Sequence, residues 1–253
     1  MDGLNLFASF SFTHSDRMRI KLLSLATIIF SVTSANAQFN HTATTGDMRN
    51  FASQTSIVFE RNPFSKKGNV VGSQFLFKDW ASGMVTNKEG ISFTDGLFNY
   101  DKINKNLYIF KNDTIFLVNK FQLQTIRLRD MTDSAVRYVL EKIPSLKTDD
   151  LYIVVSKGTK YSLLKEVTTK FIVANYQTNG IASSGNMYDE FKDEYKYFIL
   201  FPDGSSHPVS LKKKSVKAVL EGEKEKVDGF YKANGEAEQN ENFLSRLITS
   251  LNQ

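Results

Sequence analysis

The sequence predicts a mainly β protein with C-terminal helices, in which an antiparallel meander of about ten strands forms a barrel-like or two-layer sheet. Short apolar runs alternate with polar turns of two to five residues between positions 70 and 211. The chain contains 21 Phe and 10 Tyr, and aromatic residues favour strands. From residue 212 onward, apolar residues recur at spacings near three and four, which is typical of amphipathic helices.

The first 37 residues are predicted to direct export and are left out of the fold. Residues 18–37 (MRIKLLSLATIIFSVTSANA) contain two basic residues, an apolar run and the small-x-small sequence Ala35-Asn36-Ala37. This order is that of a secretory signal peptide cleaved after Ala37. Residues 1–17 precede the methionine where such a peptide normally begins, so we interpret them as a mis-annotated leader. The mature protein is therefore expected to be periplasmic or associated with the outer membrane.

The mature chain is predicted to begin with an N-terminal arm, residues 38–69, followed by the antiparallel β domain, residues 70–211. Apolar positions change phase between Leu123 and Ile126, which predicts a β-bulge or a strand break there. Residues 177–194 are rich in Gly, Ser and Asn and then acidic, so we predict a loop. A final hairpin is expected to turn at Pro202-Asp203-Gly204.

Residues 212–253 are predicted to form helices that pack on the sheet, because an apolar stripe must be buried somewhere. Gly222 and Gly229 are expected to weaken or divide the first helical stretch. Every apolar run after the signal peptide has the length of a strand, so no transmembrane helix is expected.

Composition excludes several kinds of chemistry. The chain has no Cys, which excludes disulfides, a cysteine nucleophile and a thiolate zinc site. No phosphate-binding loop or dinucleotide fingerprint is present, so no cofactor is predicted. The formal charge of +5 falls to +4 without the leader, which is too mild and too dispersed to predict a nucleic-acid partner.

No catalytic residue is predicted, although two arrangements resemble catalytic motifs. Ser162 and Lys165 have the S-x-x-K spacing of serine acyl enzymes, but that chemistry needs a helix and this stretch is predicted as a strand. His207 lies close to Asp203 and Ser205, but these residue types also form tight turns, and a triad is defined by geometry.

Aromatic and acidic residues form two candidate binding sites. One is a platform that could stack on carbohydrate, as an alternative to packing in the core, and it consists of Phe75, Phe77 and Trp80. The other is an acidic cluster that could hold calcium, as an alternative to a solvated loop, and it consists of Asp189, Glu190, Asp193 and Glu194.

Two further groups of residues suggest contact with the envelope and modification. A basic run could contact anionic lipid or an acidic partner, as an alternative to a solvated helix face, and it consists of Lys212, Lys213, Lys214 and Lys217. Asp113-Thr114-Ile115 and Asp133-Ser134-Ala135 fit an O-glycosylation triplet, so Thr114 and Ser134 are candidate acceptors.

Several short motifs resemble an uncharacterised family of secreted, β-rich proteins that is widespread in Bacteroidota. The motifs are residues 72–80 (GSQFLFKDW), followed by Gly83, Val85 and Gly90, then Asn99-Tyr100-Asp101, residues 161–165 (YSLLK) and residues 212–215 (KKKS). The resemblance extends over most of the mature chain. It implies export into a Gram-negative envelope and a β-rich domain, and it supplies no catalytic residues.

Together these observations favour a non-enzymatic binding or interaction module of the cell envelope, including the role of an accessory subunit of an outer-membrane complex. One alternative is a glycosidase-like hydrolase that uses two carboxylates, which would require a pair of Asp or Glu about 5–10 Å apart in a deep cleft. A second alternative is a carrier that holds an apolar ligand inside the barrel, which would require a large apolar cavity.

Overall fold

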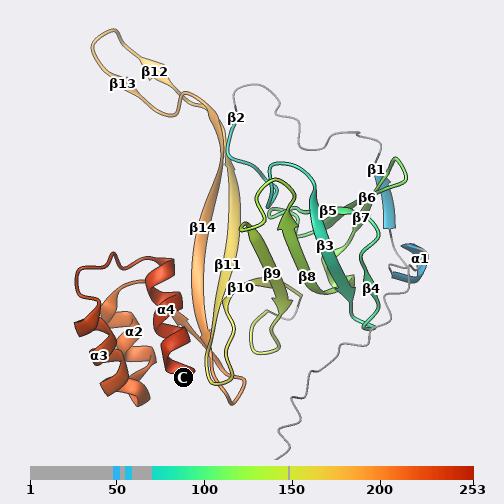
Figure 1. The fold of residues 1–253 in the computed structure, drawn as a ribbon. Coiled ribbons are helices and arrows are strands. Elements are labelled where there is room, and N and C mark those ends of the chain that lie inside the picture. Colours follow the sequence, from blue (N-terminus) through green and yellow to red (C-terminus); the bar gives the residue numbers. More distant parts are fainter. Residues whose placement is uncertain (1–47, 52–54, 59–69, 148) are drawn as a thin grey trace, which may run out of the picture. The chain divides into compact units, whose positions relative to one another are not determined.

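A computed structural model describes residues 48–51, 55–58, 70–147 and 149–253, all within one compact unit, Asn40–Gln253. The predicted leader and signal peptide, residues 1–37, lie outside the described residues, as does most of the predicted arm. The described part of the chain is mainly β with C-terminal helices, which confirms the predicted fold class at that level (Figure 1).

Thirteen strands form one mixed sheet in the order β1-β7-β6-β5-β3-β8-β9-β10-β11-β14-β15, with β2 paired to β14 and β4 paired to β3. The strands are β1 (Thr55–Val58), β2 (Val70–Val71), β3 (Ala81–Asn87), β4 (Ser92–Phe93), β5 (Leu97–Tyr100), β6 (Leu107–Lys111), β7 (Thr114–Val118), β8 (Leu123–Asp130), β9 (Arg137–Lys142), β10 (Leu151–Ser156), β11 (Ser162–Ile172), β14 (Asp189–Leu200) and β15 (Ser206–Val209). A separate pair consists of β12 (Gln177–Thr178) and β13 (Ser183–Ser184). No ladder among the described strands joins β1 to β15, so barrel closure is not confirmed.

The strand order differs from a simple meander at β3. Strand β8 pairs with β3 along seven residues rather than with β7, the strand that precedes it in the chain. The hairpins β5-β6-β7 therefore lie on one side of β3, and β8-β9-β10 lie on the other. The bulge predicted near residue 124 is confirmed, because Thr86 opposes Thr125 and Asn87 opposes Leu123, which leaves Gln124 as the extra residue.

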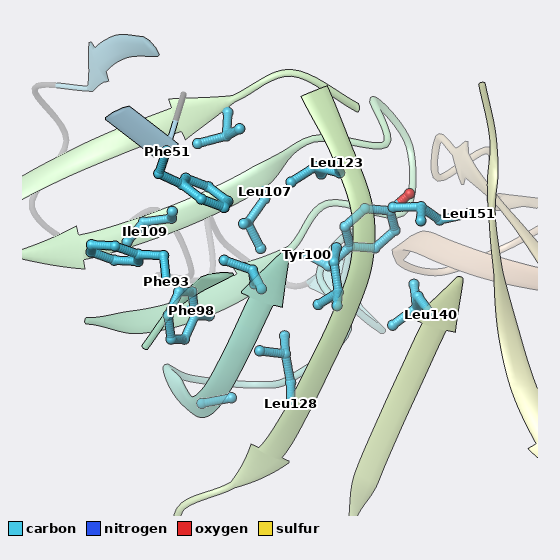
Figure 2. Packing of buried hydrophobic residues seen from close by; sticks show 14 of the residues in the cluster. Phe51, Phe93, Phe98, Tyr100, Leu107, Ile109, Leu123, Leu128, Leu140 and Leu151 are labelled. Carbon is cyan, nitrogen blue, oxygen red and sulfur yellow. The ribbon is translucent and has the colours of Figure 1, made fainter. Parts of the chain in front are cut away.

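The larger core lies between these two groups of strands and is rich in aromatic residues (Figure 2). The Phe93 ring packs edge to face against the Phe98 ring, with centroids 6.2 Å apart. It also contacts the Phe51 ring at a tilt, with centroids 5.6 Å apart. Phe98, Leu107 and Ile109 are fully buried. Burial of each such side chain contributes roughly 1.5–3 kcal/mol, so this cluster stabilises the N-terminal half of the sheet.

A buried side-chain amide helps to attach the segment that precedes β3 to this core. Asn99, which is fully buried in β5, accepts a hydrogen bond from the Phe77 amide and donates to the carbonyls of Phe77 and Asp79. Its carbonyl oxygen also accepts from the Tyr100 amide. Because an unpaired buried amide costs free energy, these partners make Asn99 specific for this position.

The C-terminal helices are α2 (Lys213–Val219), α3 (Lys224–Ala233) and α4 (Glu241–Leu251), with a 3-10 turn at Glu221–Glu223 between the first two. The predicted break at Gly222 is therefore confirmed, whereas Gly229 lies within α3. The helices bury their apolar stripes against β11, β14 and β15, which confirms the predicted packing. At the start of α4, the Glu241 carboxylate accepts hydrogen bonds from Lys165 of β11 and from the Tyr197 hydroxyl of β14, both at 2.8 Å.

The two faces of the C-terminal half of the sheet have different coverings. Successive residues of a strand point to opposite faces. Leu163 and Ile199 belong to the cluster that the helices cover, whereas their neighbours Leu164 and Phe198 belong to a smaller cluster with Tyr152 on the other face. The helices therefore cover one face, and the other face is only partly covered by the segment before β10.

Candidate functional site

The longest hairpin of the sheet forms an arm that consists of β11, β14 and the segment between them. Eleven residue pairs join its two strands, from Ser162 opposite Leu200 to Ile172 opposite Glu190. Residues 173–188, which we call the tip, contain the small β12-β13 pair and extend beyond the neighbouring strands (Figure 1). The base of the arm lies in the sheet and under the helices, so a rigid support carries the tip.

Cross-strand side-chain contacts hold the arm together below the tip. The rings of Phe171 and Phe191, which oppose each other, have centroids 4.9 Å apart. Lys170 donates to Glu194 at 2.7 Å, and this hydrogen bond lowers the pKa of the Glu194 carboxyl. The Thr169 hydroxyl donates to Asp193 at 2.5 Å. Such pairs are the units that stabilise an antiparallel ladder.

The tip is ordered by its own hydrogen bonds. The Asn175 amide donates to the carbonyl of Asn186, and the Asn186 amide donates to the side-chain oxygen of Asn175. At the end of the tip, the Asn179 side chain accepts from the amides of Ile181 and Ala182. The backbone conformation of the tip is therefore specified before any partner binds.

Apolar side chains concentrate on the tip and on the adjoining strand residues. Six of the twelve large exposed hydrophobic residues in the described part of the chain belong to this region: Phe171, Val173, Tyr176, Ile181, Met187 and Tyr188. Ile181 is 97% exposed. Residues 173–188 include no charged residue. An apolar, uncharged and ordered projection is a feature that marks interaction sites.

The predicted aromatic platform is divided between the core and the surface. Phe75 and Phe77 are buried, and their rings contact Tyr108 and Tyr138 edge to face. Trp80 is half-buried and stacks on Phe110 with centroids 5.4 Å apart. The three rings therefore do not form one exposed face, because two of them pack inside the sheet.

The predicted acidic loop is a strand in the structure, which corrects the loop assignment for residues 189–194. These residues alternate between the two faces of β14, and three of the four acidic side chains accept hydrogen bonds from their own chain. Asp189 accepts from the Ala174 amide at 2.7 Å, and Asp193 and Glu194 accept from β11 as described above. In the described residues, no group of three or more His, Asp or Glu lies in an arrangement that could hold a metal ion.

The predicted basic run lies at the start of α2 and is partly engaged within the protein. Lys217 forms an ion pair with Asp228 of α3, and the Lys213 amine lies 5.0 Å from the centre of the Tyr231 ring. Lys212 is the residue before α2, and it lines a groove together with residues of β14 and β15. Lys214 is exposed.

The remaining candidates lie in turns and strands. Thr114 begins β7 and donates to the Asn112 carbonyl, and Ser134 is exposed in the turn between β8 and β9. Ser162 and Lys165 lie three apart in β11 and so face opposite sides, as predicted. Asp203 accepts from the Ser205 hydroxyl, and not from His207, so the three residues lack the order of a catalytic triad.

The structure also gives the dimensions of two openings that bear on the alternatives. A cavity beside Tyr100 and Leu140 has a volume of about 10 Å³, enough for one water molecule. A larger groove of about 910 Å³ is lined by one acidic residue, Glu166, rather than by a pair of carboxylates. No helix among the described residues is long and apolar enough to cross a membrane.

Comparison with known proteins gives no relative: no protein-family model matches the chain, and no curated protein or solved structure is significantly similar to it. The resemblance to secreted proteins of Bacteroidota therefore stays a prediction. The sequence did not predict the arm as a site. The signal was present in the uncharged run of residues 173–188, where Val173, Tyr176, Ile181, Met187 and Tyr188 lie among Gly, Ser and Asn.

Proposed function

We propose that this chain is an exported binding module of the cell envelope that holds a partner protein through the tip of the β11-β14 arm. The observation that carries this proposal is the combination of apolar exposure, absence of charge and internal order at residues 173–188. A role as an accessory subunit of an outer-membrane complex is the most specific form of the proposal. The sequence of residues 18–37 supports the location, since it has the features of a signal peptide.

The composition of the tip favours a protein partner over a lipid surface. Binding to anionic membranes depends on Lys and Arg beside the apolar residues, and residues 173–188 contain neither. They contain Tyr, Ser, Gly and Asn, which are the residues enriched in protein-binding loops. Tyr176 and Tyr188 offer large apolar rings with a polar end, which suits contacts that are partly hydrated.

The order of the tip reduces the cost of association. Binding by a flexible loop would lose about 0.5–1.5 kcal/mol for each side chain that becomes immobilised, in addition to the backbone entropy. The hydrogen bonds of Asn175, Asn179 and Asn186 have already fixed the backbone. The Tyr176 hydroxyl also donates to Ser183 at 2.9 Å, which orients its ring across the β12-β13 pair.

A site-specific crosslinking experiment tests the proposal. A photoreactive residue is placed at Ile181 in the tip or, as the matched control, at Met131, which is 59% exposed in the turn between β8 and β9. We expect the probe at position 181 to capture one envelope protein in living cells, and the probe at position 131 to capture none. Capture of the same proteins from both positions, or from neither, would contradict the proposal.

A double substitution in the tip tests whether its exposed apolar side chains carry the binding. Tyr176→Ser and Met187→Ser together remove two exposed apolar side chains and leave the backbone hydrogen bonds of the tip in place. We expect these changes to abolish the crosslink from position 181 without changing the circular dichroism spectrum or the unfolding midpoint. A crosslink of unchanged yield would show that the apolar side chains do not carry the binding.

A further inference from the structure

The groove of about 910 Å³ lies at the edge of the sheet where β15 ends, apart from the tip of the arm. Strand β15 has four residues and β14 has twelve, so β15 covers only the Tyr197–Leu200 part of β14. The segment that follows β15 then leads away toward α2. The lining comes from β14, from residues 208–212 and from the segment before β10.

The apolar lining combines Phe198 and Tyr152, on the face that the helices leave uncovered, with Leu211, which packs against the helix-covered cluster. Phe198 opposes Pro208 in the ladder, and its ring contacts the buried Tyr152 edge to face at 5.9 Å. Leu146 and Leu211, both half-buried, extend the apolar lining on either side. Most of the groove's surface is therefore hydrocarbon or aromatic, and its volume lies within the roughly 300–1,000 Å³ that small-molecule sites occupy.

The charged residues of the groove are unbalanced toward positive charge. Lys147, Lys196 and Lys212 line it together with one acidic residue, the buried Glu166. Lys147 forms an ion pair with Glu166 at 3.5 Å. Within the described residues, Lys196 and Lys212 form no ion pair within 4.0 Å, although Lys196 opposes Glu166 in the ladder. Two ammonium groups thus remain available at the edge of an apolar surface.

We infer that this groove binds an anionic amphiphile, with its single apolar chain against Phe198 and Pro208 and its anionic head between Lys196 and Lys212. The argument is complementarity of charge combined with apolar lining: a neutral apolar ligand would leave the two ammonium groups unused, and a small anion would leave the hydrocarbon surface in water. Each buried methylene of the chain adds favourable transfer free energy, so affinity rises with chain length. The inference is independent of the function proposed for the arm.

Calorimetric titration of the purified protein with palmitate, below the concentration at which palmitate aggregates, tests the inference. We expect saturable binding of one palmitate per chain. Hexadecanol, which has the same chain without the charge, and decanoate, which has a shorter chain, are both expected to bind at least tenfold more weakly. A lysophosphatidic acid with the same chain distinguishes a phosphate head from a carboxylate head.

Two pairs of charge reversals provide the matched comparison. Lys196→Glu with Lys212→Glu is expected to weaken palmitate binding at least tenfold. Lys214→Glu with Lys232→Glu changes the net charge equally at exposed positions outside the groove, and it is expected to leave binding unchanged. Absence of saturable binding, an equal loss in both pairs, or equally tight binding of inorganic phosphate alone would overturn the inference.

Discussion

The Lys102 amine lies 2.7 Å from the Asp193 carboxylate, although the two residues are 91 positions apart in the chain. Lys102 follows β5 in the N-terminal half of the sheet, and Asp193 lies in strand β14 of the arm, below the tip. The same carboxylate accepts from Thr169 of the opposing strand. This ion pair therefore connects the arm to the part of the sheet that faces it.

Removing the positive charge of this pair should loosen the arm. Lys102→Met keeps most of the apolar stem, but it leaves Asp193 with the Thr169 hydroxyl as its main partner. We expect the free energy of unfolding to fall by about 1–2 kcal/mol in urea titrations. Hydrogen exchange should become faster in β11 and β14. The control is Lys192→Met, an exposed position one residue away on the other face. Equal destabilisation by both variants would contradict the prediction.

The glycines of the tip allow its shape to be changed without removing an apolar side chain. Both Gly180 and Gly185 have positive φ, but a Cβ at Gly185 would lie 2.3 Å from the Asn175 carbonyl oxygen, whereas a Cβ at Gly180 would contact nothing. Gly185→Ala should therefore displace the paired strands of the tip and reduce crosslinking from position 181 at least tenfold. Gly180→Ala should cost about 1 kcal/mol of local backbone strain and retain the crosslink. The amide chemical shifts of Asn175 and Asn186 report the displacement. Chemical-shift changes of equal size in Gly185→Ala and Gly180→Ala would contradict the prediction.

Glu241 provides a test of how the helices are held on the sheet. Glu241→Ala removes the acceptor for Lys165 and Tyr197, and we expect a loss of roughly 2 kcal/mol. Burial raises the pKa of the Tyr197 phenol, and the Glu241 carboxylate raises it further. In the variant, Tyr197 should therefore ionise at lower pH in an absorbance titration. Glu225→Ala, at an exposed position in the first turn of α3, should change neither quantity.

Stability in acid should depend on Asp150, which accepts hydrogen bonds from Lys105 at 2.7 Å and from Lys120 at 2.9 Å. Burial opposes ionisation of this carboxyl, but the two lysine amines outweigh burial and lower its pKa below the ordinary value of 3.8. A lowered pKa means that the stabilisation is present above about pH 4 and is lost as pH falls through the folded-state value. Asp150→Asn should be less stable than the natural chain at pH 7, and the difference should shrink below pH 4. A difference that is constant from pH 7 to pH 3 would exclude this role.

Local sequence patterns predicted much of the fold because the relevant forces act between near neighbours. The change of phase between Leu123 and Ile126 identified the bulge, since side chains must alternate across a half-buried strand. The turn at Pro202-Asp203-Gly204 and the break at Gly222 were likewise visible as local signals. The predicted positions of the helices followed from their apolar spacing, which is a property of each segment alone.

Long-range pairing was not predictable in the same way. Five of residues 189–194 are charged, so the segment resembles a solvated loop unless the partners Thr169 and Lys170 are known. The place of β8 beside β3 depends on packing in the core rather than on any turn. For the candidate site, composition showed an uncharged segment, but whether Ile181 is exposed or buried is decided by how far the arm extends beyond the sheet.

The pairing of β2 with β14 has a consequence for the order in which the chain folds. It is the one parallel ladder among the described strands, and it joins Val70 to Asp189. Closing a loop of that length costs more entropy than forming the hairpins β5-β6-β7 or β9-β10-β11. We therefore expect the local hairpins to nucleate first and this non-local contact to form late, so that contact order limits the folding rate. During that interval the end of the arm next to the tip would remain open along one edge.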